Sequence, residues 1–122
     1  MTRNTEQRAA IRAVIELAQR PLSVPEVLEA ARSTVSSLGQ ATVYRVIKKG
    51  LADGWIEQID LPGEPARYER AGKHHHHHFH CRACGRMFEV PGCRVAAPDS
   101  VPAGFRVEGH DMLLHGTCRD CA

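Results

Sequence analysis

The chain has 122 residues, of which 43% are hydrophobic and 25% are charged, and its formal net charge at pH 7 is +2. This length fits one ordinary domain or two very small ones, and a very small domain usually needs a metal ion or a partner subunit for stability. The sequence shows no signal peptide and no apolar run of the ~18 residues that a membrane span requires. We therefore expect a cytoplasmic protein with no membrane partner. In the cytoplasm, paired cysteines bind metal more often than they form disulfides.

The positive charge is concentrated in the first fifty residues. This segment carries eight Lys and Arg against four Asp and Glu, whereas residues 51–73 carry three against five and residues 74–122 carry five of each sign. A basic excess of this kind is typical of a segment that contacts phosphate groups.

Two helices are predicted in the first part of the chain. The first covers residues 5–19, with Thr5 as its cap, because apolar residues recur on one face at helical spacing. It ends before Pro21, which cannot continue a helix. Ser23 and Glu26, three residues apart, form a capping box that begins a second helix. The second helix ends near Arg32.

A third helix is predicted over residues 40–53. Val43, Ile47 and Leu51 form its buried stripe, and Gly54 suits the position just past its end. The polar and aromatic side chains that lie off this stripe are Thr42, Tyr44, Arg45, Lys48 and Lys49.

Two strands, residues 55–61 and 66–70, follow the third helix around a turn that is rich in proline and glycine. Three helices followed by a hairpin describe a winged helix-turn-helix, whose last helix enters the major groove of DNA. A charged helix face by itself is usually only a solvated surface. Its place before the hairpin favours contact with double-stranded DNA.

Residues 74–85 hold six of the eight histidines and two of the five cysteines. Cys81 and Cys84 form one C-x2-C pair, and Cys118 and Cys121 form a second. Two such pairs can complete a tetrahedral shell of four thiolates around zinc. A thioredoxin-like redox motif would need one pair in a βαβ setting, and a histidine purification tag would normally be at a terminus. The pattern therefore predicts a structural zinc site.

Residues 74–80 are predicted to form a strand that leads into the first cysteine pair. Because side chains alternate between the two faces of a strand, His76 and His78 share one face, and His75 and His77 share the other. One short segment can thus supply ligands to two metal sites. Further strands are predicted over residues 86–90, 105–107 and 111–114.

The sequence resembles the ferric uptake regulator (Fur) family of bacterial metal-dependent repressors over almost its whole length. The resemblance lies in the TEQR string at residues 5–8, the ATVYR string at residues 41–45, the histidine-rich C-x2-C-G block and the terminal C-x2-C pair. It implies an α+β fold with a winged helix-turn-helix DNA-binding domain over residues 1–70. Residues 71–122 would form a small, mostly β, zinc-stapled domain for dimerisation. It further implies a homodimer that binds an AT-rich inverted repeat and has neither a small-molecule substrate nor catalytic residues.

Matched residue by residue, the resemblance implies three metal sites and a set of DNA contacts. The structural zinc ligands would be Cys81, Cys84, Cys118 and Cys121. The ligands of the regulatory site, for zinc or iron(II), would be Glu69, His76, His78 and Glu89. A second site would take His75, His77 and His110. Tyr44 and Arg45 match the residues that meet bases and phosphates, Arg8 lies in the N-terminal segment that approaches DNA, and Thr42, Lys48 and Lys49 complete the expected contact set.

The regulatory ligands suggest how such a switch would work. Glu69 belongs to the first domain and the other three ligands to the second, so an ion held by all four would tie the domains together. A ligand that binds one of two states more tightly shifts the population toward that state.

Several positions depart from the family pattern. A further histidine of the regulatory site falls on Arg20, an acidic ligand of the second site falls on Ala96, and the cysteine that zinc-responsive members have near position 71 is Ala71. Residues 91–103 are too short and proline-rich for the full helix that the family carries between its strands. We interpret the unpaired Cys93 as a small buried hydrophobic residue rather than as an additional metal or redox ligand.

The function indicated by these features is that of a metal-dependent transcriptional repressor of metal-homeostasis genes. Zinc is favoured by the histidine density, whereas Glu69 resembles the iron-responsive members. One alternative is a peroxide sensor in which bound iron promotes oxidation of His76 or His78, and another is a metal buffer without control of DNA binding. The signatures of a zinc hydrolase or deaminase are absent from the sequence, which argues against an enzyme.

Overall fold

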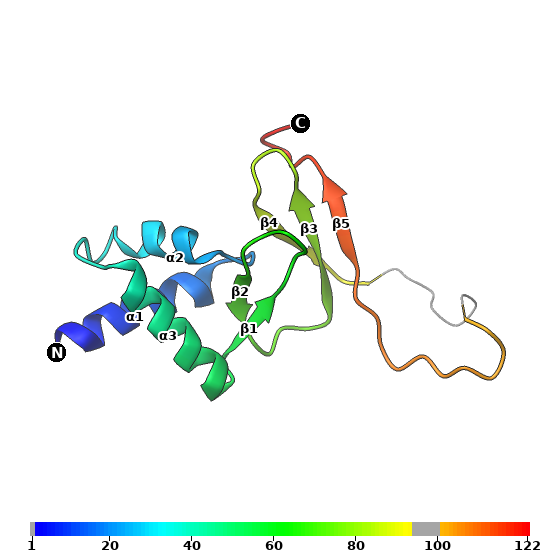
Figure 1. The fold of residues 1–122 in the computed structure, drawn as a ribbon, viewed down its shortest axis with the longest axis horizontal. Coiled ribbons are helices and arrows are strands. Elements are labelled where there is room, and N and C mark those ends of the chain that lie inside the picture. The colour runs from blue at the N-terminus through cyan, green and yellow to red at the C-terminus, as the bar shows by residue number, and fades with distance from the viewer. Residues whose placement is uncertain (1, 94–100) are drawn as a thin grey trace. The chain divides into compact units, whose positions relative to one another are not determined.

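The computed structural model describes residues 2–93 and 101–122. The chain forms two compact units, Met1–Lys73 and His74–Ala122 (Figure 1). This boundary falls three residues beyond the division at residue 70 that the sequence suggests. Among the described residues, no helix is both long and apolar enough to cross a membrane.

The first helix, α1 (Arg3–Leu17), begins and ends about two residues before its predicted bounds. Its cap is Thr2, whose hydroxyl accepts a hydrogen bond from the Thr5 amide at 3.2 Å, so the prediction of Thr5 as the cap is wrong. Both threonines can serve as caps, and capping at Thr2 adds a first turn in which the Glu6 amide donates to the Thr2 carbonyl at 3.0 Å.

The second helix, α2 (Val24–Ala31), has the predicted capping box. The Glu26 amide donates to the Ser23 hydroxyl at 3.3 Å, and the Ser23 amide donates to the Glu26 carboxylate at 3.0 Å. Arg20 also donates to that carboxylate, at 2.5 Å. These hydrogen bonds outweigh the effect of burial and lower the pKa of Glu26. Arg20 thus anchors the start of α2.

The third helix, α3 (Gln40–Asp53), ends at Gly54, as predicted, with a φ of 85° that glycine adopts without steric cost. Val43 and Ile47 are fully buried in the core that the three helices share. Gly50 is also buried, and a β-carbon there would lie 2.4 Å from Ile56 Cδ1. The absence of a side chain at Gly50 therefore lets the hairpin pack closely against the last turns of α3.

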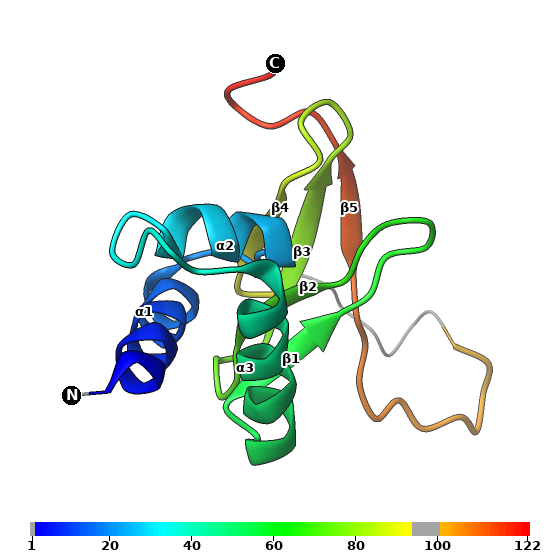
Figure 2. The same cartoon turned by 60° about the vertical axis from the view of Figure 1, so that its left-hand side comes forward.

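The hairpin consists of β1 (Ile56–Ile59) and β2 (Arg67–Arg70), paired antiparallel (Figure 2). The segment before α2 joins it, because Leu22 and Tyr68 exchange two backbone hydrogen bonds of 2.8 and 2.9 Å. The first unit is therefore the predicted winged helix-turn-helix, with its wing fixed to the helical core.

The second unit is a three-stranded sheet with the order β4–β3–β5. The histidine-bearing strand β3 (His76–Cys81) lies in the centre, antiparallel to β4 (Met87–Pro91) and parallel to β5 (Leu113–Gly116). The prediction of a strand at residues 105–107 is wrong, because this segment has no strand partner and Phe105 is 69% exposed. Alternating apolar residues alone do not form a strand without a neighbour to bond to.

Truncation of Ile47 tests the helical core. We expect Ile47→Ala to lower the free energy of unfolding of the first unit by about 2–5 kcal/mol, because it leaves a cavity among fully buried side chains. Urea titration followed by the fluorescence of Trp55, the one tryptophan of the chain, measures this unit. Leu17→Ala, at a side chain that is 80% exposed, is the control and should change stability by less than about 0.5 kcal/mol. An equal effect of both variants would contradict the described core.

Candidate metal centres and a basic helix face

The four cysteines of the two C-x2-C pairs converge at one end of the second sheet. Cys81 is the last residue of β3, and the parallel register that pairs Cys81 with Gly116 brings the end of β5 beside it. All four Sγ atoms lie within 4.8 Å of one another, and Cys84 and Cys118 are 3.8 Å apart. A tetrahedral zinc ion with Zn–S bonds of ~2.3 Å requires sulfur atoms about 3.8 Å apart. The cluster therefore has the donor set and dimensions of a structural zinc site.

Backbone amides prepare this cluster for a cation. The amides of Cys84 and Cys118 donate to Cys81 Sγ at 3.4 and 3.3 Å and lower the pKa of Cys81 to about 6. The hydrogen bond between Cys121 and Cys118, followed by burial, raises the pKa of Cys121 to about 12. The four thiolates are therefore stable together only when a positive ion offsets their repulsion.

A second cluster lies on one face of the sheet and contains His75, His77, His110 and Cys93. His110 Nε2 is 3.2 Å from His75 Nε2, 3.3 Å from His77 Nε2 and 2.9 Å from Cys93 Sγ. Burial, and then the neighbouring His75 and His110, lower the pKa of His77 and favour the neutral ring that binds metal. The structure thus brings together the three histidines that the sequence assigns to a second site.

Cys93 is the member of this cluster that the sequence analysis missed. Its interpretation as a buried hydrophobic residue is wrong, because the side chain is exposed and contacts His110. The two residues are 17 apart in sequence with no spacing motif, so the pattern gave no signal for this contact. Ala96, which occupies the expected acidic position, lies outside the described residues.

His76 and His78 point to the other face of β3, with ring centroids 4.9 Å apart. Glu89 is paired with His78 across β3 and β4, and its carboxylate lies 3.7 Å from His76 Nε2. His76 Nδ1 lies 2.7 Å from the backbone carbonyl of His74, so Nδ1 carries the ring proton and donates it. In this tautomer the lone pair of His76 is on Nε2, the nitrogen that lies beside Glu89 and that would bind a cation. The fourth predicted ligand, Glu69, is on β2 of the first unit, where Lys73 Nζ lies 3.5 Å from it.

The predicted DNA-contacting residues of α3 form a basic, mostly exposed face. Tyr44 is 48% exposed, and Lys48 Nζ lies 5.5 Å from the centre of its ring. Arg45 donates to the Thr42 hydroxyl at 3.0 Å, which holds its guanidinium along the first turn of the helix. Lys49 pairs with Asp53 at 3.4 Å.

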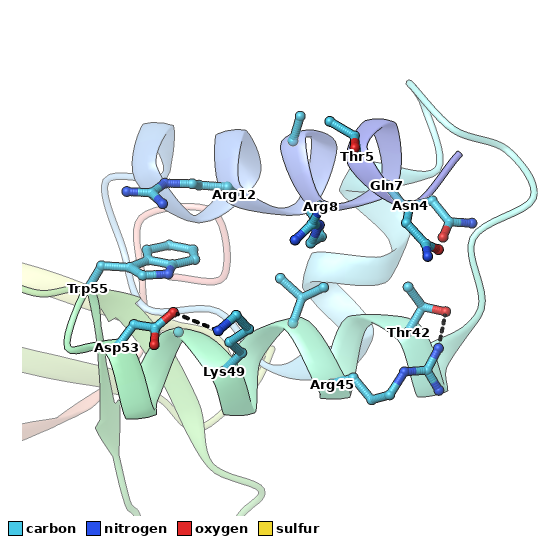
Figure 3. Close-up of a pocket in the computed structure, with 13 residues that line it drawn as sticks. Asn4, Thr5, Gln7, Arg8, Arg12, Thr42, Arg45, Lys49, Asp53 and Trp55 are labelled. Carbon is cyan, nitrogen blue, oxygen red and sulfur yellow. Dashed lines mark hydrogen bonds and ion pairs between the residues drawn. The ribbon is translucent and has the colours of Figure 1, made fainter. Parts of the chain in front are cut away.

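An open groove of about 710 Å³ runs between α1 and α3 (Figure 3). Arg8 lines it from α1, and Arg45 and Lys49 line it from α3. At one end Arg12 lies over the indole ring of Trp55, 4.4 Å from its centroid. Four cationic side chains, together with several amide and hydroxyl groups, line one concave surface. These are the kinds of groups that bind the phosphate backbone of nucleic acids. The remaining polar residues that line the groove are Asn4, Thr5, Gln7, Thr42 and Asp53.

Comparisons with known proteins are consistent with these features. The model of the ferric uptake regulator family matches residues 1–115. The zinc uptake regulation protein of Mycobacterium tuberculosis is 34% identical over 98% of this chain and 94% of its own length. The ferric uptake regulation protein of Campylobacter upsaliensis is 33% identical over 70% of this chain and 57% of its own length.

Solved structures give the same result. A zinc-bound manganese uptake regulator has a TM-score of 0.79 at 26% identity and covers 96% of this chain and 91% of its own. The structure of FurB from M. tuberculosis, a zinc uptake regulator, has a TM-score of 0.55 at 33% identity and covers 98% of this chain and 95% of its own.

Substitution of Cys81 tests the four-cysteine cluster. We expect Cys81→Ser to remove one zinc ion per chain and to unfold the second unit, because structural zinc contributes directly to folding. Native mass spectrometry measures the metal content, and circular dichroism measures the folding. Arg82→Ala, at the exposed neighbouring residue, is the control and should keep the metal. A folded Cys81→Ser protein with unchanged zinc content would rule out this site.

Proposed function

The chain belongs to the ferric uptake regulator family, whose members are transcriptional regulators and not enzymes, and we propose that it is a cytoplasmic, metal-dependent repressor of metal-homeostasis genes. In this proposal a homodimer binds an AT-rich inverted repeat in double-stranded DNA when its regulatory site is loaded. The observation that carries the proposal is the combination, in one chain, of a basic winged helix with metal-ligand clusters on both faces of β3.

DNA contact is assigned to the exposed face of α3 and to the groove beside it. Arg45 and Tyr44 extend from the first turns of α3, the part of a recognition helix that meets base edges. Arg8 and Lys49 flank the groove and would contact phosphates, which fix the register of the protein on the duplex. Two such helices in a dimer would reach two half-sites about one helical turn apart.

The four-cysteine cluster is assigned to structural zinc. Cys81 and Cys84 connect β3 to β4, and Cys118 and Cys121 follow β5. Joining the two pairs would hold the sheet closed at this end, which a unit of this size needs because its apolar core is small.

The regulatory site is assigned to His76, His78 and Glu89, with Glu69 as the expected ligand from the first unit. Bound zinc or iron(II) would supply the positive charge that draws these ligands together. His76 is held with Nε2 facing the carboxylate of Glu89, so two of the ligands are already oriented toward each other. Recruitment of Glu69 would then favour one arrangement of the units and thereby the DNA-binding state.

Zinc is the favoured regulatory metal. Mixed imidazole and carboxylate ligands accept either zinc or iron(II), so this donor set alone does not select between them. The zinc uptake regulation protein of M. tuberculosis matches nearly the whole chain, whereas the ferric uptake relative from C. upsaliensis matches a shorter part.

Substitution of Arg45 tests the DNA-binding face. We expect Arg45→Ala to lower operator affinity by about 10-fold or more, because one charge-assisted contact to a base or phosphate is lost. Fluorescence anisotropy with labelled DNA measures the affinity at fixed salt concentration. Arg106→Ala removes the same charge from an exposed position of the other unit and should bind DNA normally. Equal affinities of the Arg45→Ala and native proteins would place the DNA interface elsewhere.

The paired histidines test the metal switch. We expect the double variant His76→Ala/His78→Ala to remain a folded, zinc-stapled dimer whose affinity for DNA no longer rises with added zinc or iron(II). The reason is that the variant retains Glu89 as its one regulatory ligand from the second unit. His115→Ala, at an exposed histidine on β5, is the matched control. A double variant that still responds to metal would contradict the assignment of these ligands.

A further inference from the structure

We propose that Cys93 is the fourth ligand of the second metal site, which makes it a three-histidine, one-thiolate site selective for zinc. The family pattern that the sequence resembles expects a carboxylate, and the position where it falls is occupied by Ala96. Metal binding by Cys93 does not depend on the proposed repressor function; only the biological role of the bound metal rests on it.

The positions of the donor atoms fit one tetrahedral ion. Bonds of ~2.0–2.1 Å to nitrogen and ~2.3 Å to sulfur place tetrahedral ligand atoms about 3.3–3.6 Å apart. The two described distances from His110 Nε2 to other imidazoles are 3.2 and 3.3 Å, and its distance to Cys93 Sγ is 2.9 Å. All four donor atoms lie within 4.8 Å of one another, so small side-chain adjustments would bring them to the distances of a tetrahedral shell.

These ligands come from three segments, each at or next to the end of a strand. His75 and His77 come from the start of β3, Cys93 follows the end of β4, and His110 precedes β5. Pairing of β3 with both neighbouring strands brings the end of β4 and the approach to β5 beside the histidines, so Cys93 and His110 lie next to them although neither is in a strand. The site is built within the second unit alone.

One hydrogen bond must change when an ion binds. The Met112 amide donates to His77 Nδ1 at 3.2 Å, so the ring proton of neutral His77 is on Nε2. Coordination through Nε2 moves this proton to Nδ1 and breaks the hydrogen bond. No such hydrogen bond to Met112 constrains His110, whose Nε2 lies within 3.3 Å of a donor atom of each of the other three residues.

The thiolate changes which ions the site prefers. Carboxylate oxygens suit magnesium, calcium and manganese, whereas thiolates suit zinc and other softer ions. A site of three imidazoles and one thiolate is therefore expected to discriminate against manganese more strongly than a site that contains a carboxylate. Cys93 is in this sense the residue that determines the specificity of the second site.

Cobalt(II) is a spectroscopic probe for this site, because thiolate ligation produces a sulfur-to-cobalt charge-transfer band in the near ultraviolet. The titration uses the full-length His76→Ala/His78→Ala protein, so that the regulatory ligands do not compete. Its four-cysteine cluster is filled with zinc, and mass spectrometry at each point verifies that this zinc stays bound. We expect a tetrahedral cobalt spectrum with the charge-transfer band at one equivalent of cobalt per chain.

Three matched variants in the same background separate the outcomes. Cys93→Ser should lose the charge-transfer band and bind zinc roughly 100-fold more weakly, since one of four strong ligands is replaced by a weak one. His110→Ala should lose the cobalt spectrum. Cys93→Asp should retain metal binding without the charge-transfer band and gain affinity for manganese relative to zinc.

A cobalt spectrum that is the same in the Cys93→Ser variant, or unchanged zinc affinity, would overturn the proposal and leave Cys93 as a hydrogen-bond partner of His110. None of these measurements uses DNA. A failure of the proposed repressor function would instead appear as normal metal binding together with no metal-dependent binding to the operator.

Discussion

The pairing of β3 on both of its edges is the constraint on which the second unit depends. Antiparallel pairing with β4 sets Glu89 opposite His78, and parallel pairing with β5 sets Gly116 beside Cys81. The parallel register is what brings the second cysteine pair to the first, across 33 intervening residues. A parallel pair needs a long crossover, and a metal ion held by the cysteines at the ends of both strands would offset the entropy that closing this connection costs.

A central strand also explains how one histidine run serves two sites. Alternation along β3 places His75 and His77 with His110, and His76 and His78 with Glu89. Each group is completed by residues from a neighbouring strand or strand end. The two faces therefore carry different donor chemistry, a carboxylate on one side and a thiol on the other, although the histidines themselves are equivalent in sequence.

The first unit relies on a different kind of constraint, the local capping and close packing of short helices. The Ser23–Glu26 capping box begins α2, and Arg20 strengthens it by an ion pair with Glu26. The mutual backbone hydrogen bonds of Leu22 and Tyr68 then fix the wing to the helices. This frame keeps the cations of α1 and α3 that line the groove on one concave surface.

The sequence alone determined the features that depend on local spacing. The capping box, the end of α3 at Gly54, the alternation of the histidines and the two C-x2-C pairs are all readable from residues within a few positions of one another. The tertiary structure decided what depends on distant partners. Thr2 is the first cap in place of Thr5, and both its hydroxyl and its carbonyl accept amide hydrogen bonds from the added turn. Residues 105–107 stayed out of the sheet for lack of a neighbour. Cys93 met His110 through the pairing of β3 with β4 and β5, and sequence spacing carries no information about a contact that backbone hydrogen bonds between separate strands create.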